Sequence, residues 1–366
     1  MRRVLWVLKE GTPGHTNQAL GVAEALKERA DVVVKTLDVP LHQGLRRFKM
    51  MHRAKKGFPS PEAAKAWLAA YEGAELVESV TSALREGDSL LFMSAGSSAA
   101  PYTLALAKAF GAKSCVVMTP SVLGVAPFDF ALVPAHDKVE GPNVMVTLGA
   151  PNGITRAALE HDSRALTSEF PPKRDKAWAV AFGGDDAYYK MTASWMARAC
   201  KALLKRAESE KATLYITTSR RTSPEAEAEL VSHMEGNPNV SMLMLASQDR
   251  RNPVPGMMGC CDVAFTTQDS VNMISECATA GLPLVVLEVP LKRSPQARLR
   301  ALLGPNRMAK NLELFLARGL AAAALPEDLA KMDLSPKALR PRGDVEFNEA
   351  RRAADWILKG WPHGGA

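Results

Sequence analysis

Short runs of consecutive apolar residues alternate along this chain with longer stretches in which apolar residues recur every three or four positions. The short runs predict buried β-strands, and the longer period predicts helices that pack on them. In the first half, strands are predicted at residues 1–8, 32–37, 89–93, 114–118, 130–133 and 144–146, with helices such as 61–72 and 100–110 between them. This alternation is typical of a parallel sheet covered by helices on both faces.

The pattern pauses and then starts again in the second half. Residues 170–176 are polar, contain two adjacent prolines and have the composition of an interdomain linker. Further strands are predicted at 178–182, 214–217, 241–245, 263–265 and 284–287. We therefore expect an α/β protein with two Rossmann-like domains facing one another across a cleft. The expected boundaries are 1–168, 176–343, and 344–366 for a final helix that crosses back to the first domain.

Composition agrees with this picture and excludes several classes of protein. A chain of 366 residues exceeds what one core usually covers. The five cysteines have no CxxC spacing and the seven histidines form no ligand-spaced pair, so we expect a reducing compartment and no metal site. The first predicted strand follows Met1 directly and no run of eighteen apolar residues occurs, so the expectation is a cytoplasmic protein without signal peptide or membrane span.

The net charge of +7 and the pI near 9.1 favour an anionic partner. Six basic residues lie in one segment in which Leu41, Leu45 and Phe48 recur at helical spacing. This predicts a basic amphipathic helix that contacts an anionic membrane or the acceptor, with an ordinary solvated helix as the alternative. The basic positions are Arg46, Arg47, Lys49, Arg53, Lys55 and Lys56. No nucleic-acid-binding motif accompanies them, so nucleic acid is not an expected partner.

The turn after the first predicted strand contains two glycines and a histidine. Gly11 and Gly14 allow a tight bend and close approach to a ligand, and His15 falls at the start of the next helix. A hydroxyl acceptor must lose its proton when it attacks a sugar, and an imidazole is suited to accept it. His15 is therefore the candidate general base, with a capping or core histidine as the alternative. Asn17 is a candidate to hold a donor or acceptor group.

Two polar turns in the second half follow predicted strands in the same manner. Gly183 and Gly184 are candidates to bind the nucleotide-sugar, while Asp185 or Asp186 competes with His15 as base or orients sugar hydroxyls. A second turn supplies a serine and two arginines whose planar groups suit phosphate, unless they simply face solvent. These residues are Ser219, Arg220 and Arg221.

A third polar turn precedes a short predicted helix in the second half. Asp269 and Ser270 stand at its start, where free backbone N–H groups favour an anionic phosphate. Glu276 lies about two turns further along, where it can accept hydrogen bonds from a ribose. The alternative is an N-cap serine and an exposed helix glutamate.

Five ordered motifs together resemble the bacterial relatives of the plant elongated-mitochondria (mitochondrial fission) proteins over roughly residues 1 to 300. They are Gly11 to Leu26, Gly149 to Asn152, Gly183 to Asp185, Thr217 to Thr222 and Asp269 to Glu276. More distantly, Gly11 to His15 and Ser275 to Pro283 are similar to motifs of the peptidoglycan lipid-pathway N-acetylglucosaminyltransferase. The resemblance implies the glycosyltransferase B fold and a nucleotide-sugar as co-substrate, with no other cofactor.

The implied reaction is transfer of a sugar to a hydroxyl of a glycolipid or another envelope acceptor, such as lipopolysaccharide core, at or near the inner membrane surface. Helix N-termini and basic side chains can stabilise the leaving diphosphate, so metal-independent activity is expected. Two alternatives stay open. One is an NAD-dependent oxidoreductase or sugar-nucleotide epimerase, which the absence of G-x-G-x-x-G disfavours. The other is a non-catalytic scaffold that binds membranes or partner proteins. The sequence leaves the donor, the acceptor and the stereochemistry open.

Overall fold

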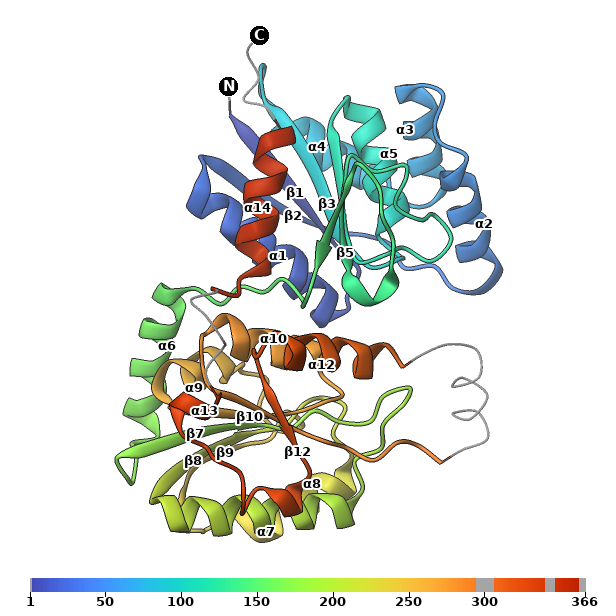
Figure 1. The fold of residues 1–366 in the computed structure, drawn as a ribbon. Coiled ribbons are helices and arrows are strands. Elements are labelled where there is room, and N and C mark those ends of the chain that lie inside the picture. The colour runs from blue at the N-terminus through green and yellow to red at the C-terminus, as the bar shows by residue number, and fades with distance from the viewer. Residues whose placement is uncertain (1, 294–305, 340–345, 362–366) are drawn as a thin grey trace. The chain divides into compact units, whose positions relative to one another are not determined.

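The computed structural model describes residues 2–293, 306–339 and 346–361. The chain forms two compact units, each built on a six-stranded parallel sheet (Figure 1). Unit 1 comprises the residues up to Gly153 together with those from Asn348 onward, and unit 2 comprises Ile154–Phe347. The α/β class and the two Rossmann-like domains predicted from the apolar pattern are confirmed.

The sheet of unit 1 has the strand order β2-β1-β3-β4-β5-β6. Its strands are β1 (Arg3–Lys9), β2 (Val32–Asp38), β3 (Ser89–Ala95), β4 (Lys113–Val117), β5 (Phe130–Pro134) and β6 (Val144–Thr147). Leu5 of β1 lies beside Val34 on one side and Leu91 on the other. All six strands were predicted from the short apolar runs, because strands buried on both faces need apolar residues at nearly every position.

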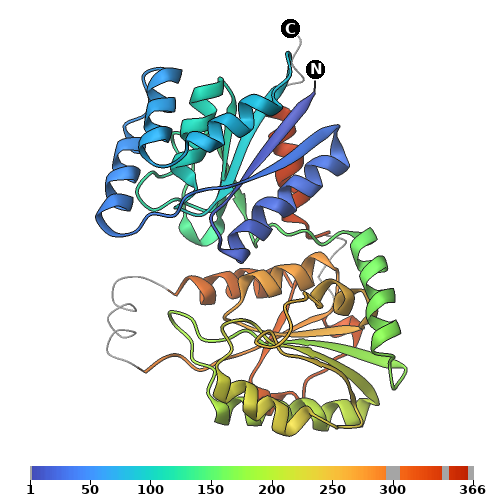
Figure 2. The same cartoon turned by 180° about the vertical axis from the view of Figure 1, so that it is seen from behind.

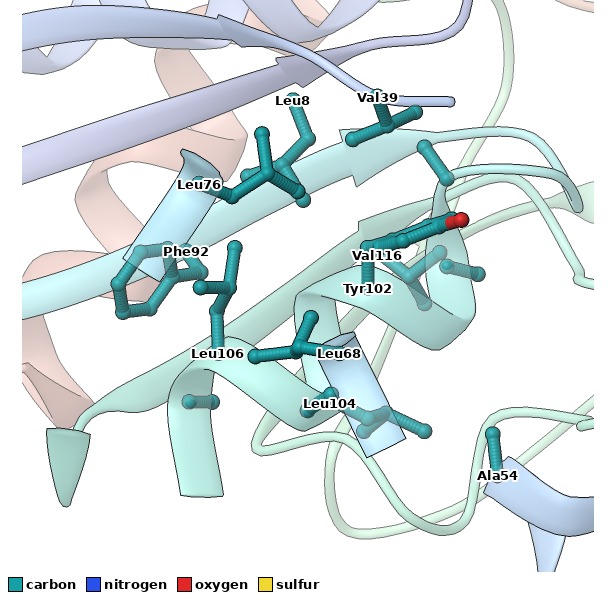
Figure 3. Packing of buried hydrophobic residues seen from close by; sticks show 14 of the residues in the cluster. Leu8, Val39, Ala54, Leu68, Leu76, Phe92, Tyr102, Leu104, Leu106 and Val116 are labelled. Atoms are coloured by element: carbon teal, nitrogen blue, oxygen red, sulfur yellow. The ribbon is translucent and has the colours of Figure 1, made fainter. Parts of the chain in front are cut away.

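Side chains alternate between the two faces of this sheet along each strand, and both sets are apolar, so helices cover both faces. Trp6 and Leu8 join the core under one set of helices, and Leu5 and Val7 join the core under the other. The first set is α2 (Gly44–Lys55), α3 (Pro61–Ala70), α4 (Ala74–Ala83) and α5 (Ala100–Phe110), and the second is α1 (Pro13–Arg29) and α14 (Glu349–Gly360). Figure 3 shows the first core, where Leu8 and Phe92 of the strands lie near side chains of these helices.

Helix α14 belongs to unit 1 although it comes from the end of the chain. It packs beside α1, as both views show (Figures 1 and 2). The guanidinium of Arg3 donates to the carbonyl oxygen of Trp361 at 3.0 Å, and the carboxylate of Glu349 accepts from the Leu148 N–H at 3.1 Å. The predicted range for this helix, 344–366, begins and ends outside the described residues, and the observed helix spans Glu349–Gly360.

The sheet of unit 2 has the strand order β12-β11-β10-β7-β8-β9. Its strands are β7 (Lys176–Ala181), β8 (Ala212–Thr217), β9 (Val240–Met244), β10 (Val263–Thr267), β11 (Leu284–Leu287) and β12 (Ala322–Ala324). The helices are α6 (Arg156–Glu169), α7 (Ala193–Glu210), α8 (Pro224–Met234), α9 (Val254–Cys260), α10 (Val271–Thr279), α12 (Arg307–Ala317) and α13 (Pro336–Leu339). Figure 1 shows α7 and α8 on one face of this sheet and α10 and α12 on the other.

The boundary between the units differs from the predicted one. The first domain was expected to extend to residue 168, but α6, which covers the last part of that range, packs on α9 in unit 2. Two glycines of α9 allow this contact: a Cβ on Gly259 would lie 2.3 Å from the carbonyl oxygen of Leu159, and one on Gly256 would lie 2.9 Å from that of Asp162. The prolines after α6 mark the entry into β7 and not a change of domain, so the prediction of 1–168 was wrong at its end.

Each sheet has one point at which the order of the strands reverses. In unit 1 the chain moves from β1 to β2 on one side and then to β3 on the other, so the reversal lies between β1 and β3. In unit 2 it lies between β7 and β10. Ligands of open α/β sheets bind beyond the carboxyl ends of the strands at such points. Within the described ranges, no helix combines the length and the apolar character that a membrane crossing requires.

Candidate functional sites at the two strand reversals

A buried glutamate connects the two strands at the reversal of unit 1. Glu10 follows β1 directly and is only 6% exposed. Its Oε2 accepts hydrogen bonds from the backbone N–H groups of Ser98 at 2.9 Å and Ala99 at 3.1 Å, where the chain enters α5. Ala99 offers no side-chain cap to α5, so Glu10 supplies the anionic partner that this helix N-terminus favours.

The other oxygen of this carboxylate holds the predicted base. Oε1 of Glu10 is hydrogen-bonded to Nδ1 of His15, which lies in the first turn of α1. When Nδ1 carries the proton that Glu10 accepts, Nε2 is the basic nitrogen of the neutral ring. The His15 side chain is 30% exposed, and its Nε2 makes no hydrogen bond to any residue that the structure describes. The pair therefore has the base-and-orienter arrangement of general-base sites.

Burial alone would raise the pKa of the Glu10 carboxyl. The hydrogen bond from His15 and the two backbone N–H groups outweigh that effect, so the pKa is lowered below its ordinary value of 4.5. Glu10 is thus a carboxylate at neutral pH, which is the state in which it fixes the His15 ring.

Gly96 makes room for this pair at the end of β3. Its φ is +84°, and a Cβ at this position would lie 2.5 Å from His15 Nδ1 and 2.7 Å from Glu10 Oε1. Only glycine fits both the conformation and the space. Gly11 also has a positive φ, of +75°, as the predicted tight turn requires, whereas Gly14 is an ordinary residue of α1. Asn17 is exposed and has no polar partner in the described part of the chain.

Two of the sequence motifs meet behind this site. Gly21 of α1 packs against the loop that contains Asn152, and a Cβ on Gly21 would lie 2.4 Å from the Asn152 carbonyl carbon. Helix α1 therefore supplies His15 to the site and Gly21 to the contact with the loop from Gly149 to Asn152.

A buried aspartate organises the reversal of unit 2. Asp269 follows β10, and its side chain is fully buried. Oδ2 accepts from the Gly184 N–H at 2.8 Å and from Nη2 of Arg221 at 2.8 Å, while Oδ1 is buried without a partner among the residues described. Asp269, predicted to bind the nucleotide-sugar, therefore links the turns after β7 and β8 to the start of α10.

The glycine turn after β7 is shaped by these contacts. The Gly183 N–H donates to Thr267 Oγ1 at 2.8 Å, and the Gly184 N–H is bound to Asp269. A Cβ would lie 2.2 Å from Asp269 Oδ2 on Gly183 and 2.1 Å from the backbone of Arg221 on Gly184. Gly183 and Gly184 were predicted to bind the nucleotide-sugar, but both N–H groups are engaged within the protein, and the glycines are needed for close packing.

The two acids after this turn are also engaged. Asp185 Oδ1 accepts from the Met191 N–H at 2.9 Å, and Asp186 Oδ1 accepts from the N–H groups of Tyr188 at 2.7 Å and Tyr189 at 2.6 Å. These contacts are typical of loop-forming aspartates. One oxygen of each carboxylate is thus committed to shaping the loop, whereas His15 is held by Glu10 through Nδ1 alone.

The predicted arginine pair divides into two roles. Arg221 is committed to the protein: besides Asp269, its Nη1 donates to the carbonyl oxygens of Gly184 and Asp185, both at 3.3 Å. Ser219 accepts from the Arg221 N–H at 3.1 Å and so shapes the same turn. Arg220 is exposed and makes no hydrogen bond or ion pair with a described residue. Of the two, Arg220 is the one available to an anionic ligand.

Helix α10 begins at this edge of the sheet. Ser270 caps it, because its Oγ accepts from the Met273 N–H at 3.4 Å. Glu276 is half-buried, and burial raises the pKa of its carboxyl to about 7. The carboxyl has no hydrogen-bond partner among the described residues. By helical spacing it lies opposite Ile274 and Ala278, which pack on the sheet. No cluster of three or more potential metal ligands occurs in the described ranges.

A model of the family described as mitochondrial fission ELM1 matches residues 13–361. The chain belongs to the mitochondrial fission ELM1 family. The match extends past the region of about 300 residues over which the motifs predicted it, and it includes α14. No curated protein sequence matches the chain.

Solved structures of sugar-nucleotide enzymes share the fold of this ELM1-family chain. The UDP-GlcNAc 2-epimerase from Methanocaldococcus jannaschii is 12% identical with a TM-score of 0.55, covering 98% of both chains. The UDP-GlcNAc 2-epimerase from Neisseria meningitidis bound to UDP-GlcNAc is 12% identical with a TM-score of 0.52, covering 98% of this chain and 99% of its own. The glycotransferase of kitacinnamycin is 15% identical with a TM-score of 0.50, covering 99% of both. The predicted glycosyltransferase B fold is confirmed.

From the sequence, Glu10 and Gly96 of this ELM1-family chain were not predicted as site residues. A signal for each was present: an acid between a buried strand and Gly11, and a glycine three residues after the predicted strand 89–93. Their significance depends on β1 and β3 being neighbours, which the order of strands in the sheet decides and the local pattern does not.

Proposed function

We propose that this protein is a glycosyltransferase that moves a sugar from a nucleotide-sugar to a hydroxyl acceptor. The observation that carries the proposal is the Glu10–His15 pair at the strand reversal of unit 1. A fixed imidazole with an unoccupied Nε2 is the group needed to take a proton from an attacking hydroxyl. In the proposed mechanism His15 is the base, and Glu10 fixes its tautomer and stabilises the imidazolium that forms.

Unit 2 is proposed to bind the nucleotide-sugar at its own strand reversal. Glu276 has a carboxyl without a protein partner, and a ribose diol offers two O–H donors to such a group. Arg220 and the N-terminus of α10 are proposed to stabilise the diphosphate as it leaves, and this requires no metal ion. Asn17 is a proposed contact to the transferred sugar or the acceptor.

The acceptor is proposed to be an envelope glycolipid, with lipopolysaccharide core as the specific candidate, at the cytoplasmic face of the inner membrane. Support comes from the resemblance of the motifs and from the basic helix α2 (Gly44–Lys55) in unit 1. A lipid-linked acceptor would bring a hydroxyl to an enzyme that remains at the membrane surface.

The test begins with ligand binding and continues to product analysis. A thermal-shift panel of UDP-, GDP-, ADP-, CMP- and dTDP-sugars beside NAD and NADP identifies the donor, because a ligand that binds only the folded state raises the melting temperature. The nucleotide-sugar that stabilises the protein is then radiolabelled in its sugar and incubated with the protein and a membrane glycolipid extract. Transfer of label that depends on His15 supports the proposal.

Two other outcomes would overturn it. Conversion of UDP-GlcNAc to its 2-epimer without an acceptor would assign the epimerase activity of the structural neighbours from Methanocaldococcus jannaschii and Neisseria meningitidis. Failure of every nucleotide-sugar to shift the melting temperature or to react would favour a scaffold that binds membranes or proteins.

A further inference from the structure

Helix α2 (Gly44–Lys55) has an exposed apolar side as well as a buried one. Met50, Met51 and Ala54 are buried in the core of unit 1. On the opposite side, Leu45 is 67% exposed and Phe48 is 54% exposed, and Leu41, in the segment before the helix, is 59% exposed. Three large apolar side chains so exposed in one short segment are unusual for a surface that faces only water.

Cations flank this apolar stripe. Lys49, Arg53, Lys55 and Lys56 are exposed and have no ion pair or hydrogen bond with a described residue. The other two predicted contacts differ: Arg46 is paired with Glu72 at 2.8 Å, and Arg47 is half-buried. Residues 41–56 contain no acidic side chain. We define the α2 surface as Leu41, Leu45, Phe48, Lys49, Arg53, Lys55 and Lys56.

We infer that the α2 surface docks on an anionic lipid bilayer, with Leu45 and Phe48 inserted among the lipids and the four cations at the phosphate headgroups. Charge complementarity selects this occupant. A second copy of the chain would place like charges opposite one another across a two-fold axis. A nucleic acid would satisfy the cations but leave the apolar stripe in water. A bilayer interface offers both an anionic layer and an apolar layer beneath it.

The position of the α2 surface gives the docking a consequence. Leu41 Cδ1 lies 3.8 Å from the point that a Cβ on Gly11 would occupy. The α2 surface therefore borders the turn that leads to His15. A lipid-linked hydroxyl would arrive beside the base when the protein is docked. This consequence rests on the proposed function, whereas the membrane contact does not.

The test is sedimentation of the full chain with vesicles of phosphatidylcholine alone or of phosphatidylcholine with phosphatidylglycerol. We expect binding only to the anionic vesicles, and weaker binding as salt is raised. The apolar variant L45S/F48S and the charge variant K49Q/R53Q/K55Q/K56Q should each bind about tenfold more weakly or worse. All six positions are exposed, and circular dichroism checks that each variant is folded.

Matched controls separate the α2 surface from net charge and general stickiness. L84S removes another exposed leucine of unit 1, and K27Q/K65Q/R85Q/K108Q removes four other exposed cations of that unit. Both controls should bind as wild type does. In the variant F48W, brominated lipids should quench the tryptophan fluorescence to a greater extent than they do in wild type. The inference is overturned if wild type does not bind anionic vesicles or if L45S/F48S binds as tightly as wild type. It is also overturned if the control K27Q/K65Q/R85Q/K108Q loses as much binding as K49Q/R53Q/K55Q/K56Q. Vesicle binding without sugar transfer would refute only the proposed function.

Discussion

Replacing Glu10 with glutamine tests the arrangement at the centre of the proposed mechanism. Glutamine has nearly the same shape, and its carbonyl oxygen can still accept from the N–H groups of Ser98 and Ala99. Its amide then presents N–H donors to Nδ1 of His15, where the carboxylate presented an acceptor. Nδ1 must then accept a hydrogen bond, so the imidazole adopts its other tautomer. In that tautomer Nε2 carries the proton and is no longer a base.

Loss of a positioned general base costs about 10² to 10⁴ in turnover. We expect kcat of E10Q to fall by this factor while the Kd for the nucleotide-sugar changes little, because the donor is proposed to bind to unit 2. His15→Ala should cause a similar loss. The double variant should be hardly worse than either single variant, since the two residues act as one unit. E24Q, which changes an exposed carboxylate of α1, is the matched control.

The fold of E10Q should survive with a pH-dependent cost. Exchange of a charged for a neutral hydrogen-bond acceptor lowers the free energy of unfolding by about 1 to 2 kcal/mol. The pKa of Glu10 is lower in the folded than in the unfolded chain, so this part of the stability is present at neutral pH and is lost as pH falls through the folded pKa. The gap between wild type and E10Q in denaturant titrations should therefore narrow in acid. Full turnover of E10Q, or additive losses in the double variant, would refute the reasoning.

Three further changes test the donor site and the chemistry. Arg220→Ala should weaken binding of the nucleotide-sugar about tenfold or more in calorimetric titration without changing stability. Arg221→Ala should instead lower the free energy of unfolding by at least about 1 kcal/mol, because it leaves the buried Asp269 carboxylate without its cation. Equal stability of the two variants would contradict these roles. Glu276→Ala should weaken donor binding with little loss of stability, about 0.5 kcal/mol or less, and unchanged affinity would remove the ribose assignment. Transfer should persist in excess EDTA, and loss that magnesium or manganese restores would refute the metal-independent mechanism.

The strands and the two-domain class could be predicted because buried parallel strands leave an unbroken apolar signature. Strand β12 (Ala322–Ala324) was not predicted, since three alanines have little strand preference. The positions of His15 and Asp269 just beyond strand ends followed from the same signature. The contacts of Glu10 did not, because its N–H donors lie 88 and 89 residues away in the sequence. Whether a glycine serves a ligand or a neighbouring side chain also depends on such distant contacts, as Gly183 shows.

The return of α14 to unit 1 has a consequence for the order in which the protein matures. Ala353, Ala354, Ile357 and Trp361 are completely buried in the core that contains Leu5 and Val7. The segment that forms unit 2 is continuous in sequence, whereas unit 1 needs both ends of the chain. On the ribosome, the unit that is encoded first therefore cannot close its core until α14, which follows the whole of unit 2, has been translated. A nascent chain that stops before α14 leaves the part of that face beside α1 uncovered, so α1, which carries the proposed base, gains this packing partner only after unit 2 has been synthesised.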